Sequence, residues 1–346
     1  MQLSKKNLIS KKTFDLIDVF KFLAACSVVF LHCFDANKAD HIYMVQIARY
    51  GVPFFFIASG YFLFRKYQWG DTKNNFILLK KYSLRIFYLL LFWFIVWLPI
   101  MFHDPAWLNN VSWFHKIVRF IIFTIIGKGY YGFSITWYLI ASIIGALFIT
   151  LLYSLRIKPL IIFIILLPLF GLIISFSLYG SWTSSSEWAS SIIKIKDPAL
   201  SPLCGICYMG LACFLASLKN YIEKIPILVC LFFTLLFIII NHFELVNAFN
   251  NNLVKISDQY ISLPITCTLF LLLGLNFKYK IKYAIYLRNM STVIYLVHRI
   301  FAKTYMDYLN LSYNSWTLYL AVLISAIIIS FIIVKAIKNN YFKYAY

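Results

Sequence analysis

Leu16–Phe34 reads LIDVFKFLAACSVVFLHCF, an apolar stretch that nevertheless carries three ionisable side chains. A membrane-spanning α-helix needs about 20 mostly apolar residues, which this stretch supplies. Lys21 and His32 are eleven positions apart. In a regular α-helix that spacing is about three turns, so both side chains would share one face about 16 Å apart. Asp18 precedes Lys21 by three residues, and the segment therefore predicts a polar stripe along a membrane helix.

Ionisable side chains inside a membrane span are costly and usually functional. This makes His32 and Lys21 candidate functional residues. The alternative is that the lysine extends to one membrane interface and the histidine to the other, with no further role.

The whole chain has the composition of an all-α, polytopic membrane protein. It is 62% hydrophobic and 13% charged, with a mean hydropathy of +0.80. Because lipid offers no hydrogen bonds to the backbone, apolar segments of this length predict helices. We expect ten spanning helices, with the N-terminus and the C-terminus both in the cytoplasm. The ten predicted segments are 16–34, 44–64, 84–102, 135–154, 159–178, 201–218, 226–243, 259–276, 289–305 and 317–334.

The net charge of +20 does not indicate a nucleic-acid partner. In the predicted topology, the inner loops and helix ends carry roughly twice as many basic residues as the outer ones, as the positive-inside rule requires. Basic residues at the inner face also meet anionic lipids, so the lipid bilayer accounts for most of this charge.

Residues 1–346 form a single predicted integral-membrane domain. Its basic segment 1–15 and its last segment 335–346 are predicted to be cytoplasmic, and no cleavable signal peptide is expected. Segment 103–134 is a predicted external loop with an interfacial helix. The Ser- and Trp-rich loop 179–200 is a candidate cover for a sugar site or an ordinary interfacial loop.

The seven cysteines lie mostly in spans, which favours packing over a metal site.

The second span contains Arg49–Tyr61, RYGVPFFFIASGY. It combines an arginine at the outer mouth, a proline that weakens the helix, and the pair Ser59-Gly60 deep inside. Glycine permits close approach between helices. The motif is a candidate site element, and the alternative is a kinked packing helix.

Lys80, Lys81 and Arg85 enter the third span from the cytoplasmic side. Such a basic patch can bind the phosphates of a nucleotide. The alternative is that these residues only satisfy the positive-inside rule.

Two further motifs lie at the fourth and ninth spans. Trp137-Tyr138 opens the fourth span, and His298-Arg299 lies deep in the ninth at a depth similar to that of His32. A neutral imidazole has a pKa of about 6.5, which suits general-base chemistry. Arg49 and Arg299 are at a similar level and are candidates to orient an anion. A buried histidine that only packs in the core is the alternative for His298.

These motifs together resemble the acyltransferase-3 family of bacterial membrane O-acyltransferases. The corresponding stretches are Lys21 to His32, Arg49–Tyr61, Trp137-Tyr138-Leu139 and Tyr295-Leu296-Val297-His298. The resemblance covers nearly the whole chain. The chain is also similar to smaller members that act on surface polysaccharide and to the membrane half of serine-racemase resistance proteins. Two positions depart from the family pattern: Lys21 replaces the usual arginine, which removes a bidentate contact, and Ala58 replaces a common isoleucine.

The resemblance implies transfer of an acyl group, most often acetyl from acetyl-CoA, to a hydroxyl of a cell-surface or lipid-linked glycan outside a bacterial cytoplasmic membrane. Acyl-CoA is then a substrate, and no bound cofactor and no metal are expected. The implied catalytic residues are His32, Lys21 and Asp18, and Lys80, Lys81 and Arg85 would bind the donor phosphates. The residues implied to position acceptor or acyl group are Arg49, Ser59, Tyr61, Trp137, Tyr138, His298 and Arg299. His32 would act as a general base or carry the acyl group itself.

Two other functions fit parts of the sequence. Ten spans with a polar interior suit a transporter of a small metabolite or a polysaccharide unit, although no mid-span chain of Asp and Glu suggests a proton relay. A non-catalytic subunit of a polysaccharide synthase is the third possibility.

Overall fold

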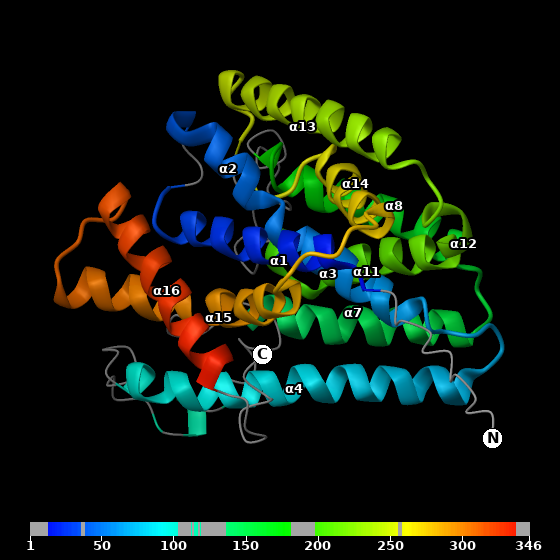
Figure 1. Ribbon diagram of the computed structural model, residues 1–346, viewed down its shortest axis with the longest axis horizontal. Coiled ribbons are helices and arrows are strands. Elements are labelled where there is room, and N and C mark those ends of the chain that lie inside the picture. The colour runs from blue at the N-terminus through cyan, green and yellow to red at the C-terminus, as the bar shows by residue number, and fades with distance from the viewer. Residues whose placement is uncertain are drawn as a thin grey trace, which may run out of the picture.

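The protein is all-α in the computed structural model, which describes residues 13–35, 39–102, 112, 114–116, 118, 136–180, 198–254 and 258–336. Twelve α-helices and several 3-10 turns lie within these ranges (Figure 1). The α-helices are α1 (Asp15–Val28), α2 (Ile42–Arg49), α3 (Gly51–Phe64), α4 (Thr72–Phe102), α7 (Trp137–Ser154), α8 (Pro159–Phe176), α11 (Pro202–Ser217), α12 (Lys219–Ile222), α13 (Ile227–Asn250), α14 (Leu263–Asn276), α15 (Ala284–Tyr308) and α16 (Trp316–Ala336).

Each of the ten predicted segments coincides with helix in the structure. Within the described residues, six helical segments are long and apolar enough to cross a membrane. They are Ile42–Phe64, Thr72–Pro99, Trp137–Ser154, Pro159–Phe176, Ile227–Asn250 and Trp316–Lys335. Two more apolar helices, α11 and α14, are shorter. The count of ten crossings and the orientation of the termini stay predictions.

The first segment is not one regular α-helix. α1 ends at Val28, and the chain continues as a 3-10 helix, η1 (Val29–His32). A 3-10 helix has 3.0 residues per turn and rises about 2.0 Å per residue. The expectation that Lys21 and His32 lie on one face of a single α-helix is therefore wrong, because the turn geometry changes between them.

The second segment divides into α2 and α3 at Tyr50. Pro53 explains the division, since it has no N–H to donate to the carbonyl oxygen of Arg49 one turn earlier. The prediction of a weakened helix at this proline is confirmed.

The third segment begins earlier than predicted, because α4 starts at Thr72 and not near residue 84. The sequence predicts a cytoplasmic loop for residues 65–83, of which residues 72–83 are helical in the structure. Lys80 and Lys81 instead lie on the exposed face of the helix. Lysine and arginine are good helix formers, and their long side chains let a helix extend beyond its apolar part.

The core has two parts that meet at the middle of the molecule. One part lies among α3, α7, α8, α11 and α14, and the other lies among α1, α4, α15 and α16. Val52 and Tyr138 pack against both. In Figure 1, α1 lies beside α15 between these two parts.

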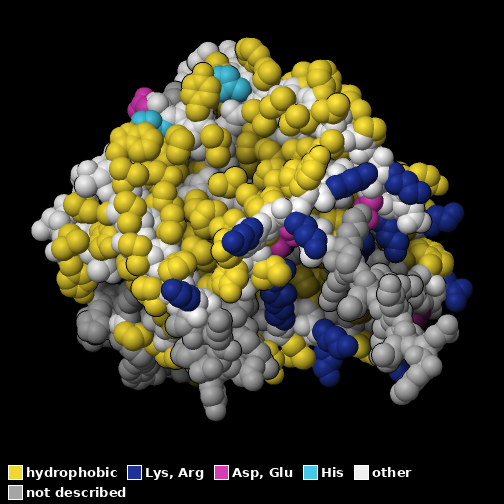
Figure 2. Space-filling model, in the orientation of Figure 1, with side chains coloured by type: hydrophobic (Ala, Val, Ile, Leu, Met, Phe, Trp, Pro, Cys, Tyr) yellow, Lys and Arg dark blue, Asp and Glu magenta, His cyan; other side chains and the backbone are white. Residues whose placement is uncertain are grey.

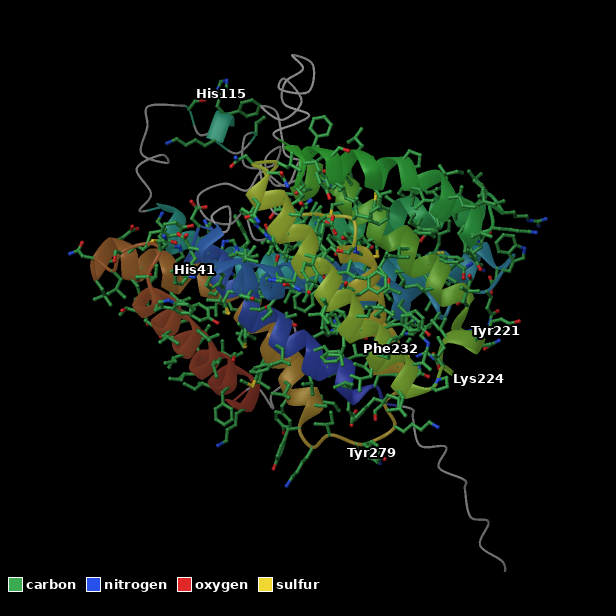
Figure 3. All side chains as sticks on the ribbon, turned by 90° about the horizontal axis from the view of Figure 1, so that it is seen from above. His41, His115, Tyr221, Lys224, Phe232 and Tyr279 are labelled. Atoms are coloured by element: carbon green, nitrogen blue, oxygen red, sulfur yellow. The ribbon has the colours of Figure 1, made fainter. Side chains whose placement is uncertain are left out.

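Positive charge gathers toward one end of the helices. In Figure 2, most Lys and Arg side chains lie on the side of α12 and of the loop before α15, whereas apolar side chains dominate the rest of this face. Figure 3 shows Tyr221, Lys224 and Tyr279 toward this end and His41 and His115 at the other. Several predicted segments lie mostly outside the described residues. They are the interfacial helix within 103–134, the loop 179–200 and both terminal segments.

Candidate functional site

His32 and His298 come together where η1 packs against α15. Their ring centroids are 4.9 Å apart, and the ring planes are tilted by 31°. His32 ends η1, and His298 lies in the middle of α15 with no exposed surface. This contact agrees with the prediction that the two histidines lie at similar depth, and it joins helices far apart in the sequence.

Arg299 completes the group by binding His32. Its Nη1 lies 3.0 Å from Nδ1 of His32. In the described part of the chain no carboxylate lies within ion-pair distance of Arg299, although it interacts electrostatically with Tyr313 and Cys33. The guanidinium therefore sets its positive charge beside the imidazole. We call His32, His298 and Arg299 the histidine cluster.

His298 is held by its own helix. Its Nδ1 lies 3.1 Å from the carbonyl oxygen of Ile294, one turn earlier in α15. Its Nε2 is buried and has no hydrogen-bond partner among the described residues. Buried polar atoms are normally paired, so this nitrogen is a candidate to accept a hydrogen bond from water or from a bound molecule.

A series of aromatic side chains in contact with one another extends from the histidine cluster. The Tyr295 ring centroid lies 6.1 Å from that of His298 and 5.7 Å from that of Tyr138. Tyr138 packs at 4.7 Å against Phe56, which also contacts Trp137 at 6.0 Å. The structure thus separates Tyr138 from the histidine cluster by the Tyr295 ring, and Phe56 lies between Tyr138 and Trp137.

Arg49 is also near the histidine cluster, but it has a partner of its own. It forms an ion pair with Asp258, and both side chains are nearly buried, at 12% and 6% exposure. Arg49 is close enough to interact electrostatically with His32. Since a buried charge needs a counter-charge, Asp258 holds Arg49 in place at the end of α2. Nothing in the sequence singled out Asp258.

Lys21 and Asp18 belong to a second group at the other end of α1. Arg288 Nη1 lies 3.7 Å from Asp18 Oδ2, and Lys21 interacts electrostatically with Asp18, Arg288 and Arg85. Nζ of Lys21 also lies 5.5 Å from the centroid of the Phe62 ring. We call Lys21, Arg85 and Arg288 the basic cluster. Its three cations leave positive charge in excess beside Asp18.

The predicted phosphate-binding residues are separated by the structure. All three side chains are exposed on α4, but of the three it is Arg85 that interacts with Arg288 and Lys21. Arg288 was missed as a site residue. A signal for it exists, since it precedes His298 by ten positions much as Lys21 precedes His32 by eleven.

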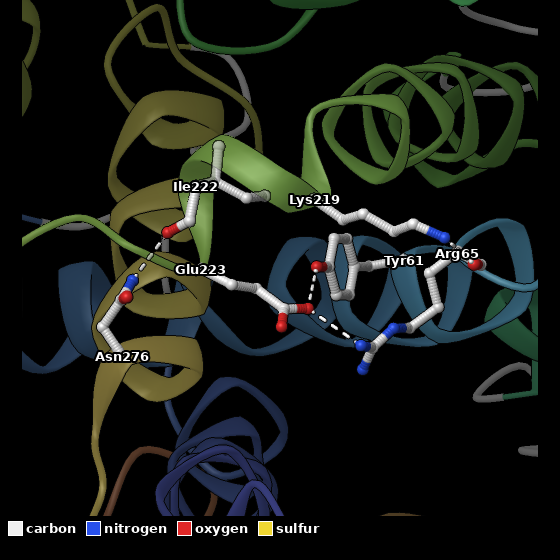
Figure 4. A network of polar contacts seen from close by, with 6 residues as sticks. All are labelled: Tyr61, Arg65, Lys219, Ile222, Glu223 and Asn276. Carbon is white, nitrogen blue, oxygen red and sulfur yellow. Dashed lines mark hydrogen bonds and ion pairs between the residues drawn. The ribbon is translucent and has the colours of Figure 1, made fainter. Parts of the chain in front are cut away.

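Ser59 interacts with Tyr138, whereas Tyr61 lies in other contacts. Ser59 Oγ donates to the Phe56 carbonyl at 3.2 Å and accepts from Tyr82 at 3.4 Å. Tyr61 donates to Glu223 at 2.7 Å, and Arg65 pairs with the same carboxylate at 2.9 Å (Figure 4).

The contacts of Glu223 place Tyr61 in a network that joins α3 to α12. Lys219 contributes to it by donating to the Arg65 carbonyl at 3.1 Å (Figure 4). This network fastens two helices and involves neither histidine. The Glu223 carboxylate at its centre was not anticipated from the sequence.

The chain matches one family model and is similar to a known protein, but it matches no solved structure. The family model Acyl_transf_3, described as an acyltransferase domain, matches residues 14–335. An amino-acid racemase of Enterococcus faecalis is 26% identical over 341 residues, covering 93% of this chain. The chain spans 46% of the length of that relative. No solved structure matches.

Proposed function

Because this chain belongs to the acyltransferase-3 family, we propose that it is a membrane O-acyltransferase that modifies a cell-surface glycan. The acyl group, which we take to be acetyl, would pass from acyl-CoA in the cytoplasm to a hydroxyl of a glycan outside the membrane. The enzyme would lie in a bacterial cytoplasmic membrane as a multi-pass protein with cytoplasmic termini.

The histidine cluster is the observation that carries this proposal. Acyl transfer from a thioester to a hydroxyl needs a base for the hydroxyl proton and hydrogen-bond donors for the developing oxyanion. Two imidazoles and a guanidinium without a carboxylate partner in the described chain supply both within one contact group. Burial strengthens such interactions because it removes competing water.

The basic cluster supports an anionic donor. The phosphates of CoA would bind Arg85 together with Lys21 and Arg288, with Lys81 one turn away on α4. From Lys21, α1 and η1 run toward His32 over about 18 Å, by the rises of α and 3-10 helices. The pantetheine arm would follow this path and would bring the thioester to the histidine cluster.

The charge distribution supports the proposed orientation. Lys and Arg gather at the end of the molecule that holds the basic cluster (Figure 2), and the positive-inside rule places such an end in the cytoplasm. The histidine cluster would then be in the outer half of the membrane, within reach of a glycan at the outer surface.

Proton NMR of purified surface glycan tests the function. Three strains are compared: the gene deleted, the deletion complemented with wild type, and the deletion complemented with His32→Ala at matched membrane abundance. We expect O-acyl signals to disappear on deletion and to return with wild type only. The esterified hydroxyl would be identified by its shifted ring proton.

Equal O-acylation in all three strains would contradict the proposal. It would favour the alternative, a transporter of a small metabolite or a polysaccharide unit, which uptake of labelled substrate would then measure.

A further inference from the structure

The two rings of the histidine cluster differ in which nitrogen can hold a proton. We propose that His298, through Nε2, is the base that accepts the proton of the acceptor hydroxyl, and that Arg299 holds His32 as an Nε2–H hydrogen-bond donor. This division of roles rests on the proposed acyl transfer. It reverses the expectation that His32 is the base.

The contact with Arg299 fixes the proton of His32. A guanidinium has only N–H donors, so Nδ1 of His32 must accept the 3.0 Å hydrogen bond. In a neutral imidazole the other nitrogen then carries the hydrogen, which places it on Nε2. Protonation of Nδ1 would remove this bond and set a second positive charge beside the guanidinium. His32 is therefore a poor proton acceptor and a good hydrogen-bond donor.

The contact with Ile294 fixes the opposite arrangement in His298. A carbonyl oxygen only accepts, so the 3.1 Å contact requires a hydrogen on Nδ1. The lone pair of the ring is then on Nε2, which is the buried atom without a hydrogen-bond partner in the described part of the chain. An accepting atom in that state is costly to maintain, and a hydroxyl group would satisfy it.

The reaction follows from these two assignments. The hydroxyl oxygen attacks the thioester carbon as its proton passes to Nε2 of His298, and a C–O bond forms. Nε2–H of His32 and the Arg299 guanidinium stabilise the oxyanion. The C–S bond then breaks, and the CoA sulfur takes the proton from His298. The ester and free CoA thiol leave, and both rings regain their starting state.

Matched amide substitutions separate the two roles. Asn carries its amide near the position of Nδ1, and Gln carries it near Nε2, but neither is a base. Initial rates of acetyl transfer from labelled acetyl-CoA to glycan are measured in membranes at matched protein abundance. We expect His298→Asn and His298→Gln each to lose about 10²- to 10⁴-fold, the usual contribution of a general base.

The His32 variants are expected to behave differently. His32→Gln keeps an N–H donor near the Nε2 position and should retain a rate within about tenfold of wild type. His32→Asn carries its amide only near the Nδ1 position, so it should lose about 10²- to 10³-fold, like removal of an oxyanion donor. A rate near wild type in either His298 variant, or a loss of about 10²-fold or more in His32→Gln, would overturn the proposal.

A second measurement needs no activity. Long-range ¹H–¹⁵N spectra of wild-type protein with ¹⁵N-labelled histidine distinguish Nδ1–H from Nε2–H in each of the six histidines. We expect the Nε2–H form at His32 and the Nδ1–H form at His298. The reverse pattern would refute the assignment even if the His298 variants fail to fold. If wild-type membranes transfer no acetyl group, the proposed function fails, and these spectra still test the two tautomers.

Discussion

Arg299 Nη1 lies 3.0 Å from Nδ1 of His32, and this hydrogen bond joins residues 267 positions apart. It fixes the proton of one ring in the histidine cluster and sets a positive charge beside the other. Both effects depend on the packing of α1 and η1 against α15, which brings the two ends of the chain together.

Replacing Arg299 tests the value of this contact. Arg299→Ala should lower the rate of acyl transfer about 10- to 100-fold, because a hydrogen bond from a charged donor contributes about 1.5–3 kcal/mol. Arg299→Lys should recover only part of the loss, since a lysine has different reach and geometry. The control is Lys282→Ala, which removes an exposed charge before α15. Equal rates in Arg299→Ala and the control would contradict this role of the guanidinium.

The Arg49–Asp258 ion pair makes a different prediction. Removing one partner of a buried pair leaves the other charge uncompensated, so Arg49→Ala or Asp258→Ala should each destabilise the protein by about 3–5 kcal/mol. The double variant should be more stable than the sum of the single losses predicts. Thermal unfolding in detergent measures the coupling. If the stability losses of the two single variants added up to that of the double variant, Arg49 and Asp258 would not stabilise each other.

The basic cluster predicts the behaviour of the donor. Arg85→Ala and Arg288→Ala should each raise the KM for acyl-CoA by about 10-fold or more, through the loss of a charged contact to phosphate. Lys80→Ala is the matched control, because its side chain is exposed on the same helix outside the cluster. If Lys80→Ala raised the KM for acyl-CoA more than Arg288→Ala, the phosphates would bind at the surface of α4 and not at the basic cluster.

Close packing of α7 on α11 predicts a stability effect. A Cβ at Gly205 would collide with the backbone carbonyl of Ala141, which cannot move without shifting α7. Gly205→Ala should therefore destabilise by about 1–3 kcal/mol, as overpacking does. Among the described residues, a Cβ added at Gly171 would meet no neighbouring helix or side chain within 4 Å, so Gly171→Ala should be neutral or slightly stabilising. Thermal unfolding of both variants measures the difference, and equal midpoints would show that α7 and α11 are not closely packed at Gly205.

Hydropathy predicted the helices well because each segment of a membrane chain must satisfy its own backbone hydrogen bonds. It did not predict the 3-10 turn at Val29–His32, because apolar composition does not distinguish α from 3-10 backbone. It also placed the start of α4 too late. The charged residues after Thr72 reduce the apolar signal without preventing helix formation.

The site was predictable where a polar residue interrupts an apolar segment, as at His32 and His298. The partners were not predictable, because nothing local in the sequence pairs Arg49 with Asp258 or Tyr61 with Glu223. Such contacts depend on helix packing. The same limit explains why Arg288, which looked like one more residue of the positive-inside pattern, was not assigned to the basic cluster.

The most direct test of the proposed function is acyl transfer across the membrane in inverted vesicles. Labelled acetyl-CoA is supplied to the exposed cytoplasmic face, and label in lumenal glycan is measured for wild type, His32→Ala and His298→Ala at matched abundance. We predict label in the lumen with wild type, and a loss of at least about 100-fold in each variant. Undiminished labelling in both variants, or no acetyl-CoA-dependent label with wild type, would contradict the proposed transfer.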